Sequence, residues 1–155
     1  MSNLPSQRQL RELLADINAA LSGSDPIEPP AHDGAAQFDF EWAGQAVHLV
    51  FNPHASPPCV SMACPLGPVP LAQVEAVLRQ LLRIAHLTAT SGSTVGYSPS
   101  EQCLYLVNSL PLPRATARLV LDALAGLADL AVHWGENHFL DRDMPVALAG
   151  ESGLV

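Results

Sequence analysis

The chain has 155 residues, of which 48% are hydrophobic and 14% are charged, against roughly 25% charged residues in an average soluble domain. Fifteen acidic residues against seven arginines give a formal net charge of −8, which disfavours nucleic acid and anionic membrane surfaces as partners. No stretch approaches the roughly 20 apolar residues of a membrane span, and residues 1–12 lack the apolar core of a signal peptide, so membrane insertion and export are not expected.

A first helix is predicted to start at Ser6, because Ser6 and Gln9 have the spacing of a capping box. Apolar residues then recur at helical spacing, at Leu10, Leu13, Leu14, Ile17 and Leu21. Ser22 and Gly23 predict the end of the helix. The segment from Ser24 to Gly34, rich in proline, aspartate and glycine, is predicted to be a loop.

Three short strands are predicted next, from alternation of apolar and polar residues. The apolar positions of the first two are Phe38, Phe40 and Trp42, then Val47, Leu49 and Phe51, with a turn at residues 43–45 between them. Three prolines interrupt residues 52–58. A third strand is predicted from Cys59 to Cys64, with Val60 and Met62 on one face.

A second helix is predicted to begin near Pro70, because proline is favoured at the first helical position. Its apolar stripe is wider than one core contact needs, and consists of Val74, Val77, Leu78, Leu81, Leu82 and Ala85. Two interpretations stay open. The helix is either buried at the centre of the domain, or it presents a face to a second copy of the chain.

Two further strands are predicted at residues 94–97 and 102–110, followed by a third helix from Arg114 to His138. The buried face of this helix is predicted at Leu119 or Val120, Leu124, Leu127, Ala131 and Trp134, and an acidic outer stripe at Asp122, Asp129 and Glu136. The predicted order is therefore α-β-β-β-α-β-β-α, an α+β domain. It is expected to span residues 1–140, with 141–155 as a flexible tail.

The residue types that carry chemistry do not form a persuasive site. Cys59, Cys64 and His54 would be needed for a soft-metal site, but structural zinc sites use closer ligand pairs, and the two cysteines of one strand would point to opposite faces. Three cysteines in a chain without an export signal are expected to be reduced thiols. Neither a metal nor another cofactor is predicted.

Catalysis is also not predicted. A cysteine hydrolase would need Cys103, His86 and Asn108 to meet, and nothing local marks Cys103 as a nucleophile. The glycine-bearing turn at residues 92–96 lacks the lysine of a phosphate-binding loop, and the chain contains no lysine. The aromatic strand pair has two interpretations. Most of its apolar residues are expected to pack on helices as one face of the sheet, and the alternative is that part of the sheet or its edge stays open for an extended peptide.

The late segments resemble the class I type III secretion chaperones, the Tir-chaperone-like family. The resemblance lies in the order of elements, in Val95-Gly96-Tyr97, and in the run from Cys103 to Leu112 that steps through Ser-Leu-Pro-Leu into the last helix. It covers about residues 6–138. The proline-rich loop at 52–58, the absence of lysine and the long segment from Asp141 depart from the family pattern.

The resemblance implies a homodimeric α+β sandwich of three helices and a twisted antiparallel sheet, located in the cytoplasm of a Gram-negative bacterium. Such a dimer holds the N-terminal segment of a secreted effector in an extended state, without catalysis. The secretion-apparatus ATPase is a further candidate partner. The implied effector-binding residues are Leu10, Leu14, Ile17, Phe38, Phe40, Trp42, Val47, Leu49, Phe51, Val60 and Met62. The implied dimer residues are Val74, Leu78, Leu81, Leu82, Leu104, Tyr105 and Leu106.

Two other classes remain open. One is a non-enzymatic regulatory adaptor of similar fold that binds a folded partner. The other is a small cysteine-dependent enzyme or metal protein, which serine substitutions at Cys59, Cys64 and Cys103 would exclude if function persisted.

Overall fold

The computed structural model describes residues 4–21, 25–30 and 34–140, and the predicted tail at 141–155 and the predicted helix stop at Ser22-Gly23 lie outside them. The helices are α1 (Leu4–Ala20), α2 (Val74–Thr88) and α3 (Ala117–Asn137), with short 3-10 turns η1 (Ala89–Ser91) and η2 (Leu112–Arg114). The strands are β1 (Ala36–Trp42), β2 (Gln45–Asn52), β3 (Cys59–Gly67), β4 (Ser93–Ser98) and β5 (Cys103–Pro111). The predicted order of elements is confirmed.

The five strands form one antiparallel sheet in the order β1-β2-β3-β5-β4. The edges of this sheet are β1 and β4. β1 and β2 are joined by a two-residue turn, in which Ala43 and Gly44 both have positive φ angles, of 50° and 77°. Such a turn matches the right-handed twist of the two strands, which fixes the register between them.

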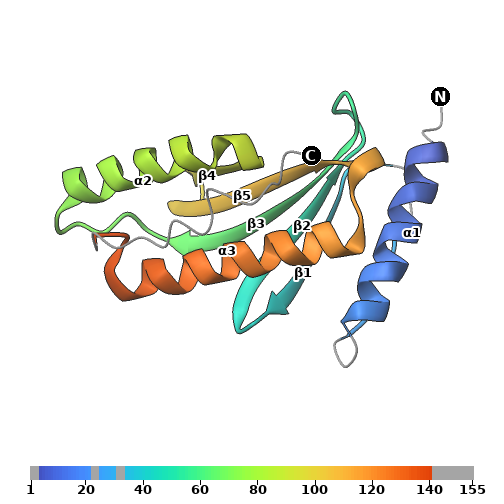
Figure 1. Cartoon of the computed structure of the whole chain (residues 1–155), viewed down its shortest axis with the longest axis horizontal. Helices are drawn as coiled ribbons and strands as arrows, with labels where there is room; N and C mark the ends of the chain where they lie inside the picture. Colours follow the sequence, from blue (N-terminus) through green and yellow to red (C-terminus); the bar gives the residue numbers. More distant parts are fainter. Residues whose placement is uncertain (1–3, 22–24, 31–33, 141–155) are drawn as a thin grey trace, which may run out of the picture.

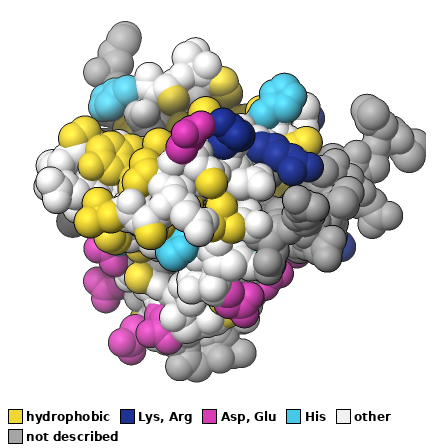
Figure 2. Space-filling view, turned by 90° about the vertical axis from the view of Figure 1, so that its left-hand side faces the viewer, with side chains coloured by type: hydrophobic (Ala, Val, Ile, Leu, Met, Phe, Trp, Pro, Cys, Tyr) yellow, Lys and Arg dark blue, Asp and Glu magenta, His cyan; other side chains and the backbone are white. Residues whose placement is uncertain are grey.

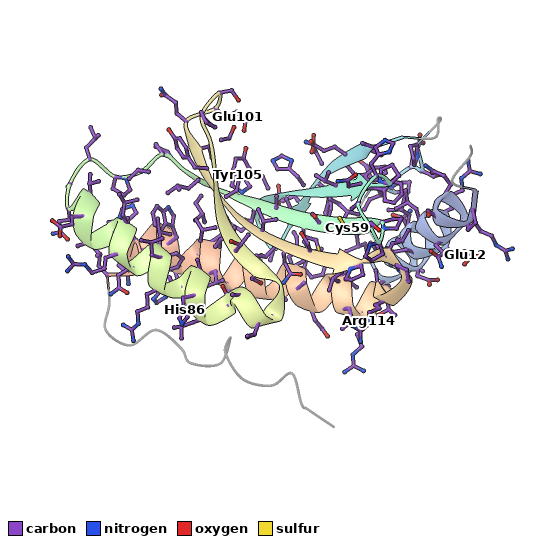
Figure 3. The ribbon with its side chains drawn as sticks, turned by 90° about the horizontal axis from the view of Figure 1, so that it is seen from above. Glu12, Cys59, His86, Glu101, Tyr105 and Arg114 are labelled. Carbon is purple, nitrogen blue, oxygen red and sulfur yellow. The ribbon has the colours of Figure 1, made fainter. Side chains whose placement is uncertain are left out.

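The helices cover one face of the sheet, as Figures 1 and 3 show. Alternate strand residues point to this covered face and are buried, while their neighbours on the other face stay partly exposed. The buried strand residues belong to one core with Val77 of α2, Ile17 of α1 and Val120 of α3. The domain is thus a two-layer α+β fold, with the helices on one side of the sheet.

The boundaries of the three helices differ from the predicted ones. Residue Ser6 lies inside α1 and does not cap it. Helix α2 begins at Val74 rather than near Pro70, because Gln73 takes a left-handed conformation, with φ of 57°, that ends the preceding turn. Helix α3 begins at Ala117 rather than Arg114, because the Thr116 side chain accepts a hydrogen bond from the Leu119 backbone N–H and caps the helix there.

Strand β3 continues beyond its predicted end at Cys64. Its register with β5 shifts between Pro65 and Gly67, so that Leu66 is the extra residue of a bulge. The Leu66 carbonyl accepts a hydrogen bond from the indole Nε1–H of Trp134 at 2.9 Å. The bulge therefore fixes the C-terminal half of α3 to the sheet, at a place where the proline and glycine residues predicted a simple stop.

Candidate functional site

Most of the predicted effector-binding residues lie in the core of the domain. Each of the following is 0–1% exposed: Leu10, Leu14, Ile17, Val47, Leu49, Phe51, Val60 and Met62. A partner cannot reach these side chains while the domain keeps this fold, so the structure gives them a packing role. Phe38, Phe40 and Trp42 of β1 differ from them, because all three are only partly buried and pack at the border of the core.

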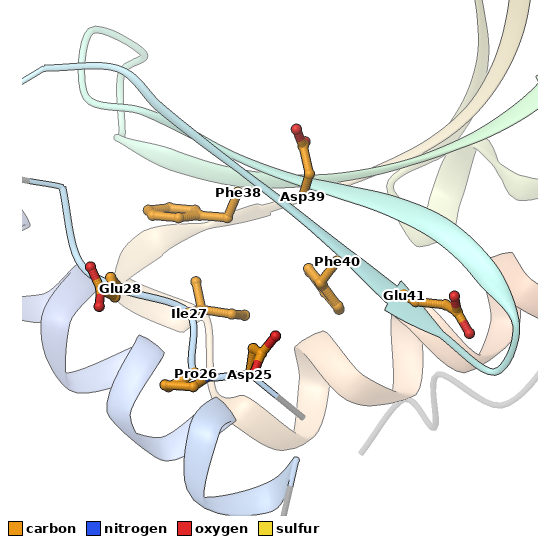
Figure 4. Close-up of a pocket in the computed structure, with 8 residues that line it drawn as sticks. All are labelled: Asp25, Pro26, Ile27, Glu28, Phe38, Asp39, Phe40 and Glu41. Atoms are coloured by element: carbon orange, nitrogen blue, oxygen red, sulfur yellow. The ribbon is translucent and has the colours of Figure 1, made fainter. Parts of the chain in front are cut away.

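A hollow of about 530 Å³ lies beside β1, between the strand and the segment that follows α1. We call it the β1 hollow, and it is lined by Asp25, Pro26, Ile27, Glu28, Phe38, Asp39, Phe40 and Glu41. In Figure 4 the rings of Phe38 and Phe40 lie on the same side of the strand as Ile27, which gives the hollow an apolar floor. Sequence reasoning missed Ile27, although it is the single large apolar residue in a loop rich in proline.

Asn18 of α1 holds the wall of the β1 hollow in place. Its side-chain amide bonds both the carbonyl and the N–H of Ile27, and Ile27 is only 7% exposed. The segment that carries Asp25 and Glu28 is therefore fixed at its centre. The hollow has a defined shape on that side.

The carboxylates at the β1 hollow fall into two groups. Asp25 and Glu28 are exposed and lie on either side of Ile27 in Figure 4, whereas Asp39 and Glu41 alternate with the phenylalanines along β1 and belong to its opposite face. There the Asp39 carboxylate accepts a hydrogen bond from the Gln37 amide at 2.9 Å and lies 2.6 Å from Nδ1 of His48. These two contacts, the Gln37 bond first, lower the pKa of Asp39 below 3.8.

A second candidate surface is the outer side of α2. Among its predicted stripe, Val77 and Leu81 are buried, whereas Leu78 is 41% and Leu82 is 73% exposed. Leu71 just before the helix and Leu87 near its end are also exposed. Figure 2 looks at the end of the molecule where α2 begins and shows hydrophobic side chains gathered there. The stripe is therefore divided between the core and the surface, and its exposed leucines remain candidates for contact with a second copy of the chain.

The predicted dimer residues of β5 do not join that surface. Leu104 and Leu106 are 4% and 2% exposed and lie in the core, while Tyr105 is on the opposite face of the sheet. The Tyr105 hydroxyl donates to Glu101 at 2.8 Å (Figure 3), and this bond raises the pKa of Tyr105 to about 12. Of the remaining predicted dimer residues, Val74 is partly buried and Leu81 is in the core.

The candidate chemical sites are dispersed. Cys64 is fully buried, and burial raises its pKa to about 11, while Cys59 points to the other face of β3. Cys103 and Asn108 lie on opposite faces of β5, and His86 is on the outer side of α2 (Figure 3). Within the described ranges, no three or more histidine, cysteine or acidic residues come together as metal ligands would. None of the described helices is long and apolar enough to span a membrane.

The chain is thus a small α+β domain with two partly exposed apolar surfaces, the β1 hollow and the outer side of α2. The model of the Tir chaperone protein (CesT) family matches residues 6–135, and the chain belongs to that family, as its resemblance implied. It is a family of type III secretion chaperones. No curated protein matches the chain in sequence.

Solved structures share the fold. One is the HopA1–SchA chaperone–effector complex, with 17% identity and a TM-score of 0.62 over 84% of this chain and 96% of that one. The ExsC–ExsE complex has the same identity and TM-score over 88% and 96%. The ExoT–SpcS complex from Pseudomonas aeruginosa has 17% identity and a TM-score of 0.54 over 81% and 96%. These likenesses confirm the predicted α+β architecture.

Proposed function

We propose that this protein is a cytoplasmic, non-enzymatic type III secretion chaperone that binds the N-terminal segment of a secreted effector in an extended state. Family membership supports the general function, and the β1 hollow supports the binding mode. β1 is an edge strand, so one row of its backbone N–H and C=O groups faces away from β2. An extended segment could add to this edge by backbone hydrogen bonds while its apolar side chains cover Phe38 and Phe40.

We further propose that two copies assemble through α2. Leu78 and Leu82 are four residues apart, so they lie on the same side of the helix, and both are exposed in the single chain. A two-fold pairing of this side would remove both from water. It would also place two effector-binding edges in one particle, which raises the effective concentration of a long segment at the second edge.

Recovery of the partner from the native host tests the function. Tagged protein should co-purify with a secreted protein, identified by mass spectrometry, and deletion of the chaperone gene should lower secretion of that protein. Trimming the bound complex with protease should leave an N-terminal effector segment protected. Recovery of a folded regulator or of the secretion ATPase alone, with secretion unchanged, would argue for the adaptor function instead.

A Phe40→Ser variant tests the binding mode. Phe40 is only partly buried, so its replacement should destabilise the fold little while weakening effector binding. Thermal unfolding of the free variant measures the change in stability. Leu119→Ser on α3, a residue that is 46% exposed, is the matched control. Equal effector recovery with both variants would place the binding surface away from β1.

A further inference from the structure

We infer that the segment that docks in the β1 hollow carries arginine or lysine next to its apolar residues. This inference rests on the proposed function, because it takes the occupant to be an extended effector segment. A basic residue beside the apolar ones would let this chain select one segment over another. The observations that support it are the shape of the hollow, the position of its carboxylates and the charge of β1 itself.

The floor of the hollow sets the spacing of the apolar side chains. Phe38 and Phe40 are two residues apart on β1 and face the same side, with Ile27 opposite them (Figure 4). An extended chain running beside β1 also repeats its side-chain direction every two residues. Its apolar residues at alternate positions would therefore meet the two rings and Ile27.

The rim of the hollow is acidic. Asp25 and Glu28 are exposed, and neither makes an ion pair with another described residue, whereas Asp39 is already engaged by His48. An arginine or lysine entering beside the apolar residues would lay its aliphatic stem on the phenyl rings and bring its charge to one of these carboxylates. An acidic segment would meet like charge at the same place.

A second copy of this chain fits the hollow poorly. Asp39 and Glu41 lie on the face of β1 opposite to Phe38 and Phe40. If two copies paired through their β1 edges, the acidic residues of both copies would come together on that face. Like charges opposite each other on neighbouring strands are destabilising. The charge pattern therefore favours a different chain with basic residues over self-association at this edge.

Three synthetic peptides with the full-length protein test the inference. The peptides share an alternating leucine–threonine core and carry arginine, glutamine or glutamate at both ends. Fluorescence anisotropy at low salt should give the arginine peptide about threefold to tenfold tighter binding than the glutamine peptide, the range expected for exposed ion pairs. The difference should shrink in high salt, because screening weakens such pairs.

The variant Asp25→Asn/Glu28→Gln should abolish this preference, so that the arginine and glutamine peptides bind with equal affinity. Asp122→Asn/Asp129→Asn, on the exposed stripe of α3, changes the net charge equally and should keep the preference. The inference is overturned if both variants lose the preference equally, or if the first keeps it, because overall charge or another site would then be responsible.

Two further outcomes distinguish a failure of the charge preference from a failure of the proposed function. Equal binding of all three peptides overturns the charge selection and leaves an apolar docking site. If no peptide binds, or if peptide binding competes with self-association of the chain, the β1 hollow is not the effector site. The chaperone function would then still depend on the co-purification and secretion experiments alone.

Discussion

Asn18 and Ile27 are joined by two hydrogen bonds of 2.8 Å, one from the Asn18 side-chain Nδ2 to the Ile27 carbonyl and one from the Ile27 N–H to the Asn18 Oδ1. The Asn18 side chain thus bonds both backbone groups of Ile27, as a neighbouring strand would, within a proline-rich segment. Ile27 is held against the core by this pair. The contact connects the end of α1 to the wall of the β1 hollow.

Asn18→Ala should therefore lower the free energy of unfolding by about 1–3 kcal/mol, because it leaves two partly buried backbone groups of Ile27 without partners. Urea denaturation followed by circular dichroism measures the change. Gln9→Ala, at an exposed position of the same helix, should stay within about 0.5 kcal/mol of the wild type. If the two variants are equally stable, the Asn18 bonds contribute nothing to the fold.

The sequence predicted the elements better than it predicted the surfaces. Alternation correctly identified Phe38, Phe40 and Trp42 as one face, because strand geometry alone determines which residues share a side. The stripe of α2 had the right period, but period does not say which of its edges the core covers. Val77 and Leu81 are buried and Leu78 and Leu82 are not, a division that depends on how α2 packs on β4.

The β1 hollow could not be predicted because it depends on contacts between distant residues. Ile27 is a single apolar residue in a loop, and only its pairing with Asn18 gives it a fixed place. The bulge at Leu66 was missed for the same reason. Pro65 and Gly67 locally favour an end to the strand, whereas the structure accommodates them by a register shift and a bond from Trp134.

Trp134→Phe should lower the free energy of unfolding by about 1–3 kcal/mol, because the Leu66 carbonyl loses its donor and the smaller ring leaves space in the core. Trp134 is 4% exposed, so solvent replaces the lost contacts poorly. Denaturation followed through the remaining Trp42 fluorescence measures the loss. Val132→Ala, at a position 47% exposed on the same helix, is the control. A loss no greater than in this control would mean that the Leu66 bond is dispensable.

Cys64 should resist thiol reagents in the folded protein. Burial raises its pKa to about 11, so at pH 8 about one thiol in a thousand is the reactive thiolate, and the side chain is also inaccessible. In a Cys59→Ser/Cys103→Ser variant, labelling should therefore be slow until denaturant unfolds the domain. Mass spectrometry over time measures it. Rapid labelling of the native variant would contradict the inward orientation of Cys64.

The contribution of Asp39 to stability should depend on pH, and the hydrogen bond from Gln37 should set the pKa at which it is lost. The folded pKa of Asp39 lies below 3.8, so its stabilising contribution is present above that value and is lost as the pH falls through the lowered pKa. Gln37→Ala removes the largest cause and should raise the pKa of Asp39 toward 3.8. NMR titration of the carboxyl carbon measures this, with Gln45→Ala on β2 as the control. An unchanged pKa in Gln37→Ala would rule out this bond as the cause.

Leu82→Glu should dissociate the proposed dimer without unfolding the chain. Leu82 is 73% exposed in the single chain, so a charge there costs the monomer little, but it would be buried without a partner at a two-fold interface. Sedimentation velocity over the micromolar range should show a dissociation constant raised about tenfold or more. Leu119→Glu on α3 adds the same charge at an exposed leucine and should leave the dimer intact. A wild type that remains monomeric, or equal effects of the two variants, would remove α2 as the interface, because only a position-specific effect distinguishes an interface from added charge.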